Sequence, residues 1–136
     1  MEIKIPSIPE QQRFIFEQAT REAIRQLEQN LNAPTVQDLA IDESQYSTEH
    51  LLPEGRWKPP HADVAYSYIE QFKRHSDYKT DKAVAEFLGF RGNNAERRLR
   101  AYREGSESPP FGVWRRLLVA TGRVPQEIIP VVAFMR

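Results

Sequence analysis

A cluster of basic and amide side chains lies between residues 91 and 103. This short stretch holds five arginines and two asparagines, and Glu96 is its one acidic residue. A guanidinium offers a rigid fork of N–H donors, and a carboxamide offers a donor beside an acceptor. Paired hydrogen bonds of these kinds suit a phosphate, or a base edge where arginine reads guanine and asparagine reads adenine. The residue types therefore predict contact with an anionic, hydrogen-bonding partner.

The apolar residues of the same stretch predict a helix around 93–103 that presents this cluster on one side. Ala95, Leu99 and Tyr102 recur at steps of four and three residues, which is the spacing of one helical face. The opposite face carries Asn93, Asn94, Arg97, Arg100 and Ala101, and Arg98 and Arg103 lie nearer the flanks. A helix with such a face suits the major groove of double-stranded DNA.

Three further predicted helices surround this one. Residues 62–75 form an amphipathic pattern, and residues 80–88 follow with Thr80 as a candidate N-cap and Gly89 where the helix would stop. Gly105 is a candidate C-cap for the arginine-rich helix. The last helix, from about Pro110 to Thr121, buries apolar residues and is stopped by Gly122.

These segments resemble the helix-turn-helix of the λ-repressor-like (XRE-type) regulators found in phages and other mobile elements. The resemblance covers roughly residues 62–129. The matching residues are Ala85, Leu88, Gly89, Phe90, Leu99, Tyr102, Arg103, Glu104, Gly105, Pro110, Trp114, Arg115, Leu117, Leu118 and Gly122. Nine residues separate Gly89 from Leu99, where a compact motif needs about five. Either the turn is enlarged or the second helix of the motif begins one turn earlier.

The resemblance implies an all-α fold: a helix-turn-helix bundle with an additional long N-terminal helix. It implies a sequence-specific DNA-binding transcriptional regulator, a dimeric repressor or autoregulator. Arg97 and Arg100 are then expected at base edges, with Asn94 as a candidate adenine reader. The expected phosphate contacts are Lys79, Lys82, Arg98 and Arg103, and Arg91 and Asn93 complete the candidate set.

The residues before this motif differ from it in their sequence pattern, which predicts three segments in the chain. We expect an N-terminal arm and long helix in residues 1–41, a linker or wrapping loop in 42–61, and the DNA-binding domain with an apolar tail in 62–136. Residues 10–31 are expected to form the long helix. One side of it carries a stripe of apolar side chains: Phe16, Ala19, Ala23, Leu27 and Leu31. This helix either packs on its own domain or pairs with its copy in a homodimer, which is the closed symmetry most common in oligomers.

Charge is distributed unevenly along the chain although its sum is zero. Residues 1–60 hold six Lys and Arg against ten Asp and Glu, a net charge of −4. Residues 61–136 hold thirteen against nine, a net charge of +4. The basic charge is therefore concentrated in the part that would contact DNA.

The residues needed for catalysis or for a metal site do not come together in the sequence. His50, His61 and His75 have no spacing that places two of them on one helical face, and there are no cysteines. We therefore expect no enzyme activity, no metal and no cofactor. No apolar run reaches the roughly 18 to 20 residues that span a bilayer, and the first residues lack the layout of a signal peptide. A cytoplasmic protein without a membrane partner is expected.

Two other functions agree with the same pattern. The first is a protein-interaction module with a helix-turn-helix-like core, such as an antitoxin, a phage inhibitor or an assembly adaptor, using residues 10–31 to bind a protein partner. The second is a DNA-binding accessory factor for recombination or partitioning. Steep weakening by salt distinguishes DNA binding from the protein-interaction alternative.

Overall fold

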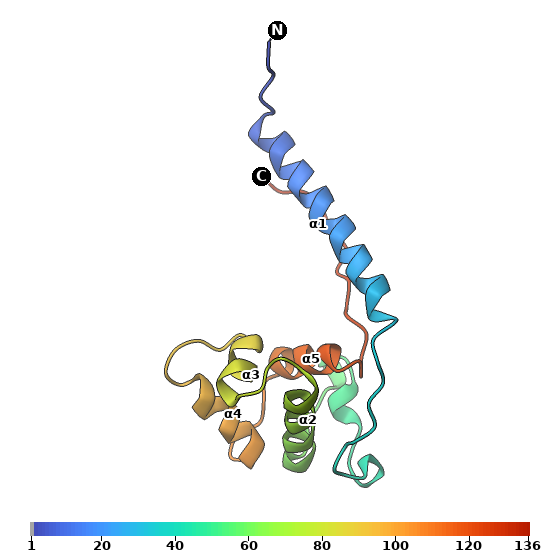
Figure 1. The fold of residues 1–136 in the computed structure, drawn as a ribbon, viewed down its shortest axis with the longest axis vertical. Helices are drawn as coiled ribbons and strands as arrows, with labels where there is room; N and C mark the ends of the chain where they lie inside the picture. The colour runs from blue at the N-terminus through green and yellow to red at the C-terminus, as the bar shows by residue number, and fades with distance from the viewer. Residues whose placement is uncertain (1) are drawn as a thin grey trace. The chain divides into compact units, whose positions relative to one another are not determined.

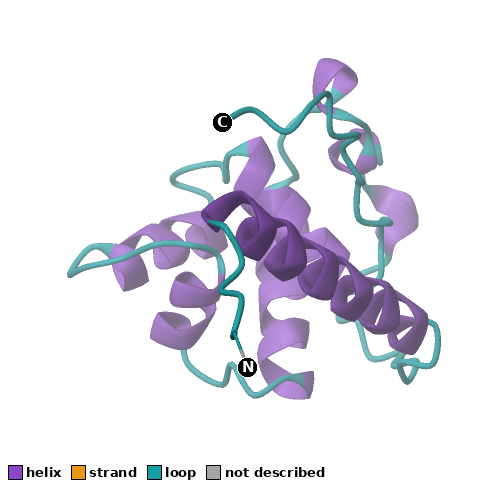
Figure 2. Ribbon diagram, turned by 90° about the horizontal axis from the view of Figure 1, so that it is seen from above, coloured by secondary structure: helices purple, strands orange, loops and turns teal. Residues whose placement is uncertain are grey.

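The regular structure of this protein is helical, as a computed structural model of residues 2–136 shows (Figure 1). The described residues contain no strand, and helices and loops make up the whole of them (Figure 2). The α-helices are α1 (Ile8–Asn30), α2 (Ala62–His75), α3 (Asp81–Phe87), α4 (Ala95–Glu104) and α5 (Phe111–Ala120). Three single 3₁₀ turns lie between α1 and α2: η1 (Glu43–Gln45), η2 (Glu49–Leu51) and η3 (Glu54–Arg56). The expected all-α class is confirmed.

The chain divides into two units, with the boundary between Gln37 and Asp38. The first unit contains α1, and the second contains all the other helices. We expected residues 42–61 to be a linker or a wrapping loop. They belong to the second unit, and Tyr46, Leu51 and Trp57 pack against its core.

α1 begins with a reciprocal set of capping bonds. The Ser7 hydroxyl accepts from the backbone N–H of Glu10 at 3.3 Å, and the Glu10 carboxylate accepts from the backbone N–H of Ser7 at 3.3 Å. This arrangement satisfies two of the N–H groups that a helix start leaves without partners. Arg13 and Glu17 form an ion pair at 3.0 Å one turn further on. The helix extends two residues further at its start than the expected range 10–31 and ends at Asn30.

The core of the second unit is built from one face of each of its α-helices. α4 packs against both α2 and α3. The buried apolar side chains are Val64, Ala65, Tyr68, Ile69, Phe72, Val84, Ala85, Leu88, Ala95, Leu99, Tyr102, Trp114, Leu117 and Leu118. Because these positions recur at helical spacing, each helix has a defined inner face and leaves its other face to solvent.

Two predicted caps are present in the structure. The Thr80 hydroxyl accepts from the backbone N–H of Ala83 at 3.1 Å, which fixes the start of α3. Gly105 ends α4 in the left-handed region, with φ at 81°. A side chain there would place its Cβ 2.7 Å from the Cβ of Ala62. Glycine is therefore required both by the backbone and by the close approach of α2.

The last residues of the chain, 125–136, have no regular secondary structure. They include six exposed large apolar side chains, namely Ile128, Ile129, Val131, Val132, Phe134 and Met135. Within the described part of the chain, no helix is long and apolar enough to cross a membrane.

Candidate nucleic-acid interface

The orientation of α4 is set by its three buried residues. Leu99 has no exposed surface, and Ala95 and Tyr102 are each 4% exposed. Arg97 and Arg100 therefore point away from the core, and both are exposed. The pattern of the sequence predicted this division of the helix, and it is confirmed.

The turn before α4 holds the other polar candidates. It comprises residues 88–94, and Gly89 leaves α3 with φ at 100°, where its backbone N–H bonds to the carbonyl of Glu86. Arg91, Asn93 and Asn94 are all exposed in this turn. We expected a helix around 93–103, whereas α4 begins at Ala95, so Asn93 and Asn94 precede it. The Asn94 side chain makes no capping bond, and its amide remains available to a ligand.

Three arginines near the start and middle of α4 form no ion pair with any described residue. They are Arg91, Arg97 and Arg100. Arg98 is also without an ion pair in residues 2–136, and its guanidinium lies 5.5 Å from the centre of the Phe90 ring. Guanidinium groups that are exposed and unpaired can form charge-assisted bonds to an incoming anion.

Arg103 differs from the other arginines of α4 because carboxylates of the same unit surround it. Its Nη2 lies 2.7 Å from Glu70, and its Nη1 lies 2.7 Å from Asp81. Lys73 completes this network with contacts of 3.6 Å to Glu70 and 2.8 Å to Asp81. All four side chains are 18 to 24% exposed. The network ties α2, α3 and α4 together through Arg103. The expected contact of Arg103 with a phosphate stays a prediction.

The charge network also fixes the protonation state of Asp81. Burial alone raises the pKa of this carboxyl. The bond from Lys73 and the charge of Arg103 outweigh burial, so that its pKa ends below the usual value. Asp81 is therefore a carboxylate at neutral pH, and it neutralises part of the local basic charge.

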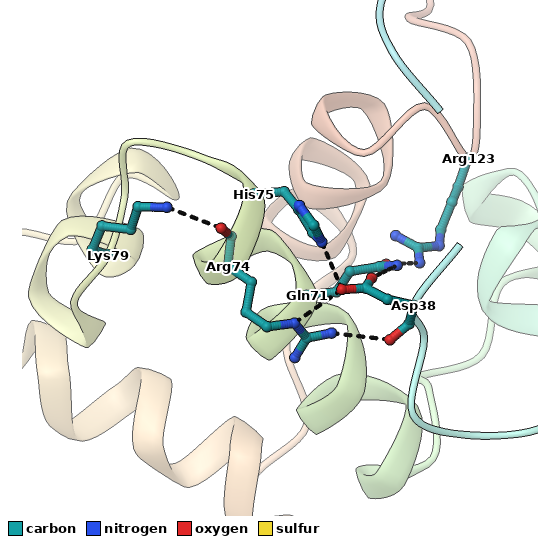
Figure 3. A network of polar contacts seen from close by, with 6 residues as sticks. All are labelled: Asp38, Gln71, Arg74, His75, Lys79 and Arg123. Atoms are coloured by element: carbon teal, nitrogen blue, oxygen red, sulfur yellow. Dashed lines mark hydrogen bonds and ion pairs between the residues drawn. The ribbon is translucent and has the colours of Figure 1, made fainter. Parts of the chain in front are cut away.

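The two candidate lysines flank the start of α3. Lys82 is exposed and forms no ion pair or hydrogen bond with any described residue. Lys79 is also exposed, and its Nζ donates to the backbone carbonyl of Arg74 at 2.9 Å (Figure 3). A lysine ammonium has three donors, so this bond leaves Lys79 able to contact a phosphate.

Asp38 is the centre of a polar network that the sequence did not predict (Figure 3). Its carboxylate lies 2.7 Å from Nε2 of His75, accepts from Gln71 at 3.0 Å and accepts from Arg74 at 3.2 Å. These bonds hold the pKa of Asp38 well below its usual value, and the bond with His75 has the largest effect. Arg123 joins the network by donating to Gln71 at 2.6 Å. Asp38 thus fastens the start of the second unit to the last turns of α2.

A buried histidine anchors the segment that precedes α2. His50 is 5% exposed, and its Nδ1 accepts from the indole N–H of Trp114 at 3.1 Å. Because an indole only donates, Nδ1 carries no proton and the ring is neutral. Burial lowers the pKa of His50. The negative charge of Glu43 raises this pKa, and the positive charge of Arg123 lowers it further. His50 and Trp114 are 64 residues apart in the sequence, so no local pattern predicts their contact.

Comparison of the chain with protein-family models, with curated proteins and with solved structures found no match.

Proposed function

We propose that this protein is a sequence-specific double-stranded-DNA-binding transcriptional regulator, a dimeric repressor or autoregulator, with α4 in the major groove. The observation that carries the proposal is the outer face of α4. There Arg97 and Arg100 are exposed and unpaired among the described residues, opposite a face that is fully packed. In this proposal α3 and α4 are the two helices of a λ-repressor-like helix-turn-helix, joined by an enlarged turn.

Local charge supports the same proposal. Residues 79–103 contain seven Lys and Arg against three Asp and Glu, a net charge of +4. One of the three acids, Asp81, is bound to Lys73 and Arg103. A basic surface of this kind supplies the affinity for phosphates that does not depend on sequence.

Each candidate residue has a role in the proposal that follows from its position. Arg97 and Arg100 read base edges, and Asn94, which directly precedes α4, reads an adenine. Lys79, Lys82 and Arg98 contact phosphates, and Arg91 and Asn93 approach the duplex from the turn. Arg103 holds α4 in place through Glu70 and Asp81.

The test is a mobility-shift assay with DNA from the region upstream of the coding sequence and shuffled DNA as competitor. Arg97→Ala and Arg100→Ala are each expected to weaken the specific complex about 5- to 150-fold, because a good bidentate arginine–guanine contact contributes about 1–3 kcal/mol. Arg25→Ala is the matched control, since Arg25 is an exposed arginine on α1. Circular dichroism checks that each variant is folded. Equal affinity of all three variants for the specific duplex contradicts the proposal.

A protein-interaction module remains the second candidate, and the exposed apolar residues of α1 favour it. The same assay separates the two functions when it is repeated between 50 and 200 mM salt. DNA binding through several phosphates weakens by orders of magnitude over this range. Binding that does not change over this range, or no binding, favours a protein partner.

A further inference from the structure

α1 is a long helix whose apolar side is not buried. It has 23 residues, and none of them is buried. Phe16 is 44% exposed, Leu27 is 38% exposed and Ile24 is 50% exposed. With Ala19 and Ala23 they span an arc of about 140° on the helix at 100° per residue. Helices in water take most of their stability from packing such a face against another apolar surface.

The sizes of the side chains on this face suit a second copy of the same helix in reverse direction. Small residues, Ala19, Thr20 and Ala23, occupy its middle, and the large residues Phe16 and Leu27 lie on either side of them. In an antiparallel pair whose two-fold axis passes between residues 20 and 21, Phe16 of one helix faces the space between Ala23 and Leu27 of the other. The large side chains then fill the spaces beside the small ones, as close packing requires.

Charge on the edge of the face favours the same arrangement. Arg13 and Glu28 lie on one edge, near opposite ends of the helix. A two-fold axis between residues 20 and 21 brings each Arg13 beside Glu28 of the partner helix, which gives two ion pairs. Arg13 already pairs with Glu17, and a guanidinium has enough donors to bind both carboxylates. In a parallel pair the same edge faces the other edge, which carries Gln12, Glu22 and Gln26. Gln12 is the one of these level with Arg13, so Arg13 has no carboxylate partner there.

We propose that α1 pairs with α1 of a second copy of this chain, antiparallel, about a two-fold axis between residues 20 and 21. The interface is the apolar face centred on Ala19, Thr20 and Ala23. It closes as a dimer because a two-fold axis uses the same surface on both copies. This inference rests on the residues of α1 and does not depend on DNA binding.

Cysteine cross-linking of the full-length chain tests the proposal, because the natural sequence has no cysteine. Thr20→Cys places the two thiols next to the axis, within the Cα separation of about 4.4–6.8 Å that a disulfide needs. Leu27→Cys is the matched control, since its two copies lie about 20 Å apart along the helices of an antiparallel pair. Mild oxidation followed by non-reducing electrophoresis measures the cross-linked fraction, and light scattering before oxidation measures the mass of each variant.

The expected result is a dimeric mass for both variants, with most of the Thr20→Cys protein and little of the Leu27→Cys protein cross-linked. Efficient cross-linking of both variants shows parallel pairing and overturns the proposal. A monomeric mass for the unsubstituted chain also overturns it, and then the apolar face is covered by another part of the chain or by a different protein. If only Leu27→Cys is monomeric, Asn30→Cys replaces it, because Asn30 lies on the same side of α1 as Ala23 and its two copies are about 28 Å apart in the antiparallel pair. Cross-linking of Asn30→Cys as efficient as that of Thr20→Cys shows parallel pairing and overturns the proposal.

Discussion

Arg97 and Arg103 show how surroundings divide one residue type into two roles. They lie on the same helix, but Arg97 is exposed and Arg103 is held by Glu70 and Asp81 at 2.7 Å each. Both were candidates from the sequence, where nothing distinguishes them except their angle on the helical wheel. The acids that bind Arg103 come from α2 and α3, so only the folded arrangement shows that its charge is already neutralised.

His50 should make the stability of the second unit depend on pH. Burial lowers its pKa in the folded state below the value of about 6.5 that an unfolded histidine has. The stabilisation that neutral His50 gives is therefore fully present above the pKa of the unfolded state. It is lost as pH falls through the lower pKa of His50 in the folded state, because protonation ends the bond from Trp114. The free energy of unfolding should fall between pH 7 and pH 5, by no more than about 1.4 kcal/mol per pH unit for this one group.

Urea unfolding at pH 5, 6 and 7 measures this dependence. His50→Gln keeps an acceptor for Trp114 but cannot titrate, so its free energy of unfolding should change less with pH than that of the natural chain. His61→Gln is the matched control, because His61 is exposed. A pH dependence that is the same in the natural chain and His50→Gln contradicts the assignment.

At the scale of the element, the network around Arg103 should stabilise the packing of α4 on α2 and α3. Arg103→Met removes the guanidinium and leaves Glu70 and Asp81 with Lys73 alone. Exposed ion pairs contribute about 0–1 kcal/mol, and breaking a buried pair costs about 3–5 kcal/mol. These side chains are about one fifth exposed, and we expect a loss of about 2 kcal/mol in the free energy of unfolding.

Chemical denaturation of Arg103→Met beside Arg97→Met measures the effect. Arg97 is exposed and unpaired among the described residues, so its substitution should change stability by less than about 0.5 kcal/mol. Equal and small losses for the two variants mean that Arg103 does not position α4.

The helices of the second unit could largely be predicted from the sequence, because their boundaries are encoded locally. α2 matches the expected range, Thr80 caps α3 and Gly105 ends α4. Each of these features depends on residues within one turn, where helical spacing and capping chemistry suffice. The arrangement of segment 38–61 could not be predicted in the same way. Its contacts, such as Asp38 to His75 and His50 to Trp114, join residues far apart in the sequence.

The candidate site was predictable in part for the same reason. Leu99 and Tyr102 define the buried side of α4, and this places Arg97 and Arg100 outside. The start of α4 at Ala95 was not predictable. It depends on the path of residues 88–94, where Phe90 bonds back to the carbonyl of Ala85 and packs beside Tyr102.

At the scale of the whole molecule, our proposals give α1 and α4 different roles. α1 joins two copies of the chain, and α4 reads DNA. In an antiparallel pair of α1 helices, the two chains leave at Asn30 about 28 Å apart. Residues 31–37 then link each α1 to the unit that contains α4. Half-sites on one face of DNA are about 34–36 Å apart.

In our proposal α4 reads base sequence, and selection from a library of random duplexes tests this reading. The natural chain should enrich a two-fold symmetric motif, since a dimer presents two copies of α4. Arg97→Ala should enrich a motif that has lost its preference at one or two base pairs in each half-site and keeps the rest. Enrichment of no motif by the natural chain, or the same motif with and without Arg97, would contradict the claim.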